Sequence, residues 1–177
     1  MPEKTSALAD SYWRTVAPET AWIHRQVRRL GVRDADLDDA TQEVLVDLYR
    51  KWESFETGRS LRAWVFGFVV NVVGNYLRRP HIRREDLTDE LEAPDGRPGA
   101  DEQIASAESR ALVVEALHSV DFERRSVFVM SEIEELPMSE IATTLAIPVN
   151  TAYSRLRLAR REFAAAVHRI KLRRGEP

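Results

Sequence analysis

Residues 139–157 read SEIATTLAIPVNTAYSRLR. Apolar residues recur three and four apart in the first half, which predicts a short helix over Ser139–Ala146 that Pro148 ends. A second helix is predicted over about Thr151–Lys171, with Ala152, Leu156, Ala159 and Phe163 facing inward. A short helix, a tight turn and a longer second helix are typical of a helix-turn-helix.

The N-terminal end of the second helix is polar and basic on its outer side, and Asn150 or Thr151 can serve as its N-cap. In such motifs this end enters the DNA major groove, where arginine pairs with guanine and asparagine with adenine, while later arginines contact phosphates. The alternative is a basic helical hairpin with no DNA contact. The predicted duplex-reading residues are Asn150, Thr151, Tyr153, Ser154, Arg155, Arg157, Arg160 and Arg161.

The chain on either side of a central segment is also predicted to be helical, because apolar residues recur at helical spacing and strand-like alternation is missing. The central segment, Pro80–Gln103, has few large apolar residues and carries eight acids against three bases. Such a segment is expected to be extended and solvated. The remaining predicted helices cover about Ala7–Leu30, Leu37–Trp52, Leu61–Arg79, Ser106–Ser119 and Phe122–Glu134.

These patterns predict an all-α fold of two small helical domains, residues 1–80 and 105–177, joined by an acidic flexible linker over residues 81–104. The length of 177 residues and the 44% hydrophobic content suit one medium or two small cores. Cysteine is absent, which excludes disulfides, thiolate metal sites and cysteine nucleophiles. No leader-like start or long uncharged run occurs, so we expect a cytoplasmic protein without membrane insertion.

Charge is unevenly distributed along the chain, although its net value is only −3. Residues 34–47 hold six acids and no base, whereas residues 149–174 hold eight bases and one acid. Asp39, Glu43 and Asp47 recur four apart on one face of the predicted helix. Like charges at this spacing weaken a helix slightly, so the stripe suggests a basic partner surface. A merely solvated face is the alternative; a metal site is disfavoured because no second element supplies ligands.

Aromatic residues concentrate in the next segment, where residues 49–76 hold seven of the fourteen aromatics and Arg78-Arg79 and Arg83-Arg84 follow. Aromatic rings beside arginines suit single-stranded nucleic acid, because unstacked bases stack on the rings and arginines neutralise phosphates. Most of these rings are nevertheless expected in the core, with two or three at most contacting nucleic acid. Asn71 lies within an apolar run, either as a buried, hydrogen-bonded residue or as an exposed one that reads a base edge.

Three segments, in order, resemble the extracytoplasmic-function (ECF) subfamily of bacterial RNA polymerase sigma factors. Residues 38–44, DDATQEV, resemble the region 2.2 motif, which in relatives docks on the clamp helices of the largest polymerase subunit. The helix-turn-helix resembles region 4, which reads the minus-thirty-five element and binds the polymerase flap. The resemblance implies core-polymerase contacts by Asp38, Asp39, Gln42, Glu43 and Asp47.

Residues 61–66, LRAWVF, followed by Asn71 and residues 75–79, NYLRR, resemble the segment that melts the promoter and reads the minus-ten element. The residue matching Asn71 helps hold a flipped base in relatives. Gly67 stands where relatives often carry Arg, and Gly74 lies in the same helix, so this segment is less basic than usual. The minus-ten contacts implied by the resemblance are Trp64, Asn71, Asn75, Tyr76, Arg78 and Arg79.

The resemblance implies an alternative, signal-responsive sigma factor that directs core RNA polymerase to specific promoters. Its expected partners are core polymerase, promoter DNA and an anti-sigma factor, with no small-molecule substrate, cofactor or metal. A stand-alone helix-turn-helix regulator with an N-terminal sensor or dimerisation domain is the alternative. We expect no enzymatic activity, since the four histidines are scattered and no nucleotide-binding, metalloprotease or serine-hydrolase motif occurs.

Overall fold

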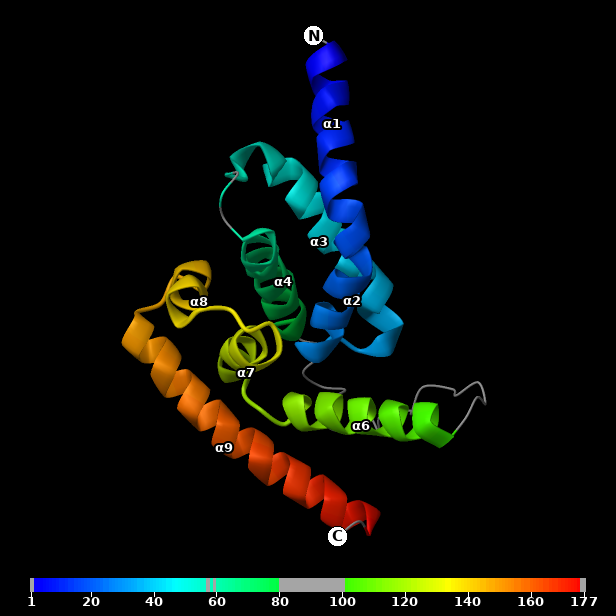
Figure 1. Cartoon of the computed structure of the whole chain (residues 1–177), viewed down its shortest axis with the longest axis vertical. Helices are drawn as coiled ribbons and strands as arrows, with labels where there is room; N and C mark the ends of the chain where they lie inside the picture. The colour runs from blue at the N-terminus through cyan, green and yellow to red at the C-terminus, as the bar shows by residue number, and fades with distance from the viewer. Residues whose placement is uncertain (1, 57, 59, 80–100, 176–177) are drawn as a thin grey trace.

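The computed structural model describes residues 2–56, 58, 60–79 and 101–175 (Figure 1). Helices make up nearly all of this part of the chain, and it contains no strand. The expectation of an all-α fold is therefore confirmed for the residues described. Most of the expected linker, residues 81–100, lies outside them.

Four α-helices form the N-terminal group: α1 (Pro2–Val16), α2 (Thr20–Arg29), α3 (Leu37–Lys51) and α4 (Leu61–Leu77). The prediction of one helix over Ala7–Leu30 was wrong, because a 3₁₀ turn at Ala17–Glu19 separates α1 from α2. Pro18 accounts for the break, since proline lacks a backbone N–H and its ring clashes with the preceding turn. Two further 3₁₀ turns, Asp34–Asp36 and Trp52–Ser54, flank α3.

The core of this group fixes the orientation of α3. Val44 and Leu48 are fully buried, whereas the acidic residues one position away along the helix face outward. The buried Tyr12 of α1 donates its hydroxyl hydrogen to the carbonyl of Leu45 at 2.6 Å, and burial raises the pKa of Tyr12 to about 12.

At the start of α4, the Ser60 hydroxyl accepts a hydrogen bond from the Ala63 N–H at 3.2 Å and so caps the helix.

The C-terminal group contains α6 (Asp101–His118), α7 (Phe122–Phe128), a π-helical turn (Val129–Ile133), α8 (Met138–Thr144) and α9 (Val149–Arg174). Helix α6 begins five residues before the predicted start at Ser106 and so includes the last residues of the segment expected to be a linker. The predicted helix over Phe122–Glu134 corresponds to α7 and the π-helical turn that continues it.

Helices α8 and α9 form the predicted helix-turn-helix. The turn is closed by a hydrogen bond from the Ile147 N–H to the Ala142 carbonyl at 3.0 Å. The prediction of an Asn150 or Thr151 cap was wrong, because α9 begins at Val149 with Pro148 as its N-cap and no side-chain cap. The carbonyl of Pro148 accepts the first hydrogen bond of the helix, from the Ala152 N–H at 3.1 Å.

The two groups pack against each other. Buried residues from both groups form one continuous hydrophobic cluster. Helix α6 contacts α2, and α8 contacts α4; α7 lies beside the lower part of α4 in Figure 1. The long α9 packs on α6, α7 and α8 and presents its outer face to solvent. The described helices therefore form a single body in which each group covers part of the other.

Candidate polymerase and promoter interfaces

The acidic residues of α3 lie on the outside of the molecule, as the periodicity predicted. Asp38, Asp39, Gln42 and Glu43 are exposed, and Asp47 is half-buried. The Asp38 side chain is fully exposed and lies 3.5 Å from His24 Nε2 of α2. Because four of these five side chains carry carboxylates, α3 offers a negatively charged surface to a partner.

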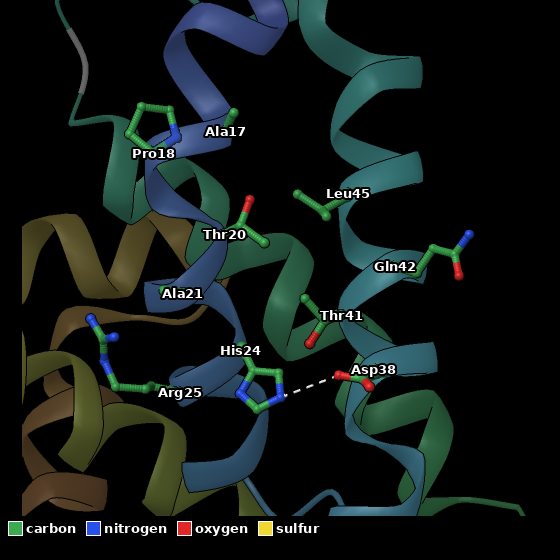
Figure 2. Close-up of a pocket in the computed structure, with 10 residues that line it drawn as sticks. All are labelled: Ala17, Pro18, Thr20, Ala21, His24, Arg25, Asp38, Thr41, Gln42 and Leu45. Atoms are coloured by element: carbon green, nitrogen blue, oxygen red, sulfur yellow. Dashed lines mark ion pairs between the residues drawn. The ribbon is translucent and has the colours of Figure 1, made fainter.

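A groove of about 730 Å³ runs between α2 and α3 beside this stripe (Figure 2). Its lining mixes small apolar side chains with polar ones: Ala17, Pro18, Thr20, Ala21, His24, Arg25, Asp38, Thr41, Gln42 and Leu45. Thr41 is 6% exposed, and its Oγ1 atom is buried without a hydrogen-bond partner in the described part of the chain. The wall of the groove formed by α2 and the 3₁₀ turn before it was not predicted from the sequence.

The exposed face of α4 combines aromatic and polar side chains. Trp64 and Phe68 are half-buried with ring centroids 4.8 Å apart, and Asn71 and Asn75 follow them at helical spacing and are exposed. Arg78 donates a hydrogen bond to Asn75 Oδ1 at 2.8 Å. The structure thus resolves the alternative left open for Asn71, whose side chain is exposed rather than buried.

Tyr76 was wrongly placed among the expected DNA contacts. It is 3% exposed, and its hydroxyl donates to Asp36 Oδ2 at 2.7 Å and accepts from Arg33 Nε at 3.1 Å. Burial, followed by the hydrogen bond to Asp36, raises the pKa of Tyr76. The ring therefore belongs to the core, whereas Arg79 is exposed and lies 3.6 Å from Glu43 of the acidic stripe.

The first turns of α9 are exposed, as predicted for a recognition helix. Asn150, Tyr153 and Ser154 are exposed, with 57% of the Tyr153 surface accessible, and Thr151 is half-buried. The exposed side chains come from successive turns at the N-terminal end of the helix. This is the end that enters the major groove in helix-turn-helix proteins.

The four arginines predicted on α9 divide into two pairs. Arg155 forms an ion pair with Glu123, and Arg160 lies 2.7 Å from Glu132. Arg157 and Arg161 are exposed, and neither has an ion-pair partner among the residues that the structure describes. Arg157 and Arg161 can therefore contact DNA without first breaking an ion pair with a carboxylate.

A buried polar cluster between the two groups was not predicted. Glu134 accepts hydrogen bonds from Trp22, Gln26 and Arg29 of α2, and burial lowers the pKa of Arg29 while the Glu134 carboxylate opposes that shift. These partners lie more than 100 positions from Glu134 in the sequence. No local pattern could have shown the contact.

Neither a metal centre nor a membrane span is found in the part of the chain that is described. No cluster of three metal-ligating side chains occurs there. No described helix is long and apolar enough to cross a bilayer.

Comparison with protein families identifies two regions. Sigma-70 region 2 matches residues 16–83, and Sigma-70, region 4 matches residues 110–163. The RNA polymerase sigma factor CnrH of Cupriavidus metallidurans is 27% identical over 164 residues, covering 88% of this chain and 85% of CnrH. The ECF RNA polymerase sigma-E factor of Escherichia coli is 29% identical over 140 residues, covering 73% of this chain and 72% of that protein.

Two solved structures share the fold. CnrH in complex with the cytosolic domain of CnrY superposes with a TM-score of 0.61 at 22% identity, covering 90% of this chain and 89% of that one. The sigma factor RpoE in complex with the anti-sigma factor NepR, from Bartonella quintana, gives a TM-score of 0.68 at 17% identity, covering 89% and 97%. Both regions and the curated relatives agree, and the chain belongs to the sigma-70 family as a sigma factor of the ECF type.

Proposed function

We propose that this chain directs core RNA polymerase to specific promoters and promotes DNA melting there, as an alternative sigma factor that responds to a stress or signal. The observation that carries the proposal is the exposed row of Asn71, Asn75 and Arg78 beside the aromatic rings of α4, within the stretch that matches region 2. We assign region 2 functions to residues 1–80 and region 4 functions to residues 105–177, with residues 81–104 between them.

Core polymerase would dock on the acidic stripe of α3 and the groove beside it. The carboxylates favour a basic partner and accelerate its association. The groove offers that partner apolar lining residues such as Pro18 and Leu45.

The minus-ten strand would lie along the exposed face of α4. A base that leaves the duplex loses stacking energy, and contact with the half-buried rings of Trp64 and Phe68 restores part of it. Amide side chains can donate to and accept from base edges, which makes Asn71 and Asn75 suitable for reading the melted strand. Arg78 and Arg79, at the end of the same helix, would contact phosphates.

The minus-thirty-five duplex would receive the N-terminal end of α9. Arg157 and Arg161 are ready for base or phosphate contacts, whereas Arg155 and Arg160 must first separate from Glu123 and Glu132. With a net charge of −3, the free chain is a poor general binder of DNA, and the polymerase would supply most phosphate contacts.

An anti-sigma factor is the further partner that we propose. Both structural neighbours were solved with a second protein bound: CnrH with the cytosolic domain of CnrY, and RpoE with the anti-sigma factor NepR. A comparable partner of this chain would cover the acidic stripe or the groove and so compete with polymerase.

The test is to purify the chain, bind it to bacterial core RNA polymerase and perform run-off transcription on a library of genomic fragments. Specific starts that require the chain support the proposal and reveal the promoter sequence. Asn71→Ala is the informative variant, because it should keep core binding but lose melting-dependent starts. Absence of core binding, together with tight duplex binding by the chain alone, would instead identify a stand-alone regulator.

A further inference from the structure

The last turn of α4 contains a hydrogen bond between two side chains on the face that we assign to the melted strand. Arg78 donates from Nη2 to Asn75 Oδ1 at 2.8 Å. Both side chains are exposed, and the residues are three positions apart, a spacing at which side chains of one helix meet. A Cβ atom at Gly74 would be 3.7 Å from Arg78 Nη2, so the guanidinium lies back over this turn of the helix.

The chemistry of the pair fixes the orientation of the Asn75 amide. A guanidinium carries five N–H donors and no acceptor, so only the oxygen of the amide can face it. The amide is planar, and its amino group is therefore directed away from Arg78 with both N–H donors available. Asn75 consequently presents donors to a strand that lies on this face, and its oxygen is already engaged.

Asn71 is not restrained in this way. Its side chain is exposed one turn earlier on the same face, and no hydrogen bond to it is found among the residues that the structure describes. A free amide can rotate and present either its oxygen or its amino group to a base. The two asparagines therefore differ in what they can select, although they are the same residue type on one face of one helix.

Contact with DNA would strengthen the restraint on Asn75. In the free chain water competes for the exposed bond between Arg78 and Asn75, so the bond contributes little net stability. A strand that covers this face excludes water, and in the drier contact both the strength of the bond and the cost of an unpaired donor increase. The Asn75 amino group then requires an acceptor on the base, and a base amino group at the same place would leave it unpaired.

We propose that Arg78 is a positioning residue, which fixes the Asn75 amide so that the chain prefers a base with an exocyclic keto oxygen at one minus-ten position. Thymine O4 and guanine O6 are acceptors, whereas cytosine N4 and adenine N6 are donors. The inference rests on the proposed function and deepens it, because it gives Arg78 a part in base selection. The other N–H groups of Arg78 remain available for a phosphate.

The adjacent arginine provides a matched control. Arg79 is exposed at the same end of α4, but its guanidinium is directed toward α3, 3.6 Å from Glu43. The Arg79 Cζ atom also lies 6.0 Å from the centroid of the Tyr76 ring. Arg79→Ala therefore removes the same charge from the same end of the helix and leaves the hydrogen bond to Asn75 in place.

The test is run-off transcription by core polymerase with the parent chain or a variant, on a promoter that the parent chain uses, with its minus-ten element randomised and the transcripts sequenced. At one position we expect the parent chain to favour thymine and guanine over cytosine and adenine by about threefold to tenfold. Arg78→Ala should remove that preference, because the released amide can rotate. Arg79→Ala should lower all starts by a similar factor and keep the preference.

Two changes at Asn75 identify the position that it reads. Asn75→Ala removes the amide and should abolish the preference at that position alone. Asn75→Asp still accepts a hydrogen bond from Arg78 but has no N–H to donate, and its second oxygen can accept from a base amino group. The Asn75→Asp variant should therefore shift the preference at the same position toward cytosine and adenine.

The outcomes separate this inference from the proposed function. An unchanged base preference in Arg78→Ala, or an equal loss of preference in Arg79→Ala, would overturn the role of Arg78 while leaving the proposed function intact. A parent chain that favours cytosine or adenine at the position identified by Asn75→Ala would overturn it as well. Absence of specific starts with the parent chain itself would instead refute the proposed function.

Discussion

Glu43 and Glu134 are both glutamates beside an arginine, and the fold gives them opposite roles. Glu43 lies on the outer face of α3 with 45% of its side chain exposed, 3.6 Å from Arg79. Glu134 is 7% exposed, and three donors of α2 satisfy its oxygens. An exposed carboxylate keeps its capacity to bind a partner, whereas a buried one is already committed to the fold.

The largest effect is expected from removing the buried carboxylate of Glu134, with the exposed carboxylate of Glu43 as the comparison. Glu134→Ala leaves Trp22, Gln26 and Arg29 without their acceptor and should lower the free energy of unfolding by about 2–3 kcal/mol. Glu43→Ala removes a surface ion pair and should change it by about 0.5 kcal/mol or less. Urea denaturation of both variants measures their free energies of unfolding. Equal losses for the two variants would show that the two carboxylates do not differ in their contribution to stability.

The exposed stripe should instead control binding. Asp39→Arg should weaken the affinity for core polymerase by about tenfold, because it places a cation against a basic partner, while thermal stability stays unchanged. Glu108→Arg on α6 is the matched charge reversal at another exposed position. Titration of labelled chain with core enzyme gives both affinities, and an equal decrease for the two variants would mean that net charge, not the stripe, governs binding.

A smaller difference is expected between two arginines of α9. Arg157→Ala should reduce minus-thirty-five-dependent transcription by about 1 kcal/mol, or roughly fivefold, because its side chain is exposed. Arg155→Ala should reduce the same transcription by a smaller factor, because Arg155 forms an ion pair with Glu123 that must break before it can contact DNA. Run-off transcription on templates with and without a good minus-thirty-five element measures both, and a larger loss for Arg155→Ala would reverse their assigned order.

The smallest effect is expected from pH, at the half-buried His118 beside the C-terminal end of α2. His118 Nε2 lies 2.8 Å from the Arg28 carbonyl, and burial, with the charges of Arg125 and Arg28, lowers the pKa of His118 although Arg28 O and Asp34 oppose the shift. The unfolded chain therefore binds a proton near pH 6.5 that the folded chain does not, so stability should fall as pH drops below 6.5.

Urea denaturation between pH 7.5 and about pH 5.5 tests this sign, with His118→Gln as the control that should flatten the dependence. A stability that rises as the pH falls would contradict the direction of the shift.

The sequence anticipated those features that depend on local spacing. The start of α3 at Leu37, the outward acids and the order of the helix-turn-helix all follow from helical periodicity over a few turns. The break at Pro18 was also readable from proline chemistry, and the prediction of one long helix there neglected it.

Burial and long-range pairing could not be predicted from the sequence. Tyr76 and Asn71 lie five residues apart on α4, yet the first is in the core and the second is exposed, because neighbouring helices cover only one side of α4. The expected cap at Asn150 or Thr151 failed because Pro148 already has the backbone geometry that begins α9.

By itself the sequence determined that the chain is helical, which faces of its helices are apolar, acidic or basic, and which family it resembles. The tertiary structure decided which polar groups are free and which are satisfied, since that depends on contacts between residues more than 100 positions apart. Helical periodicity is a property of neighbouring residues, whereas burial is a property of the assembled fold.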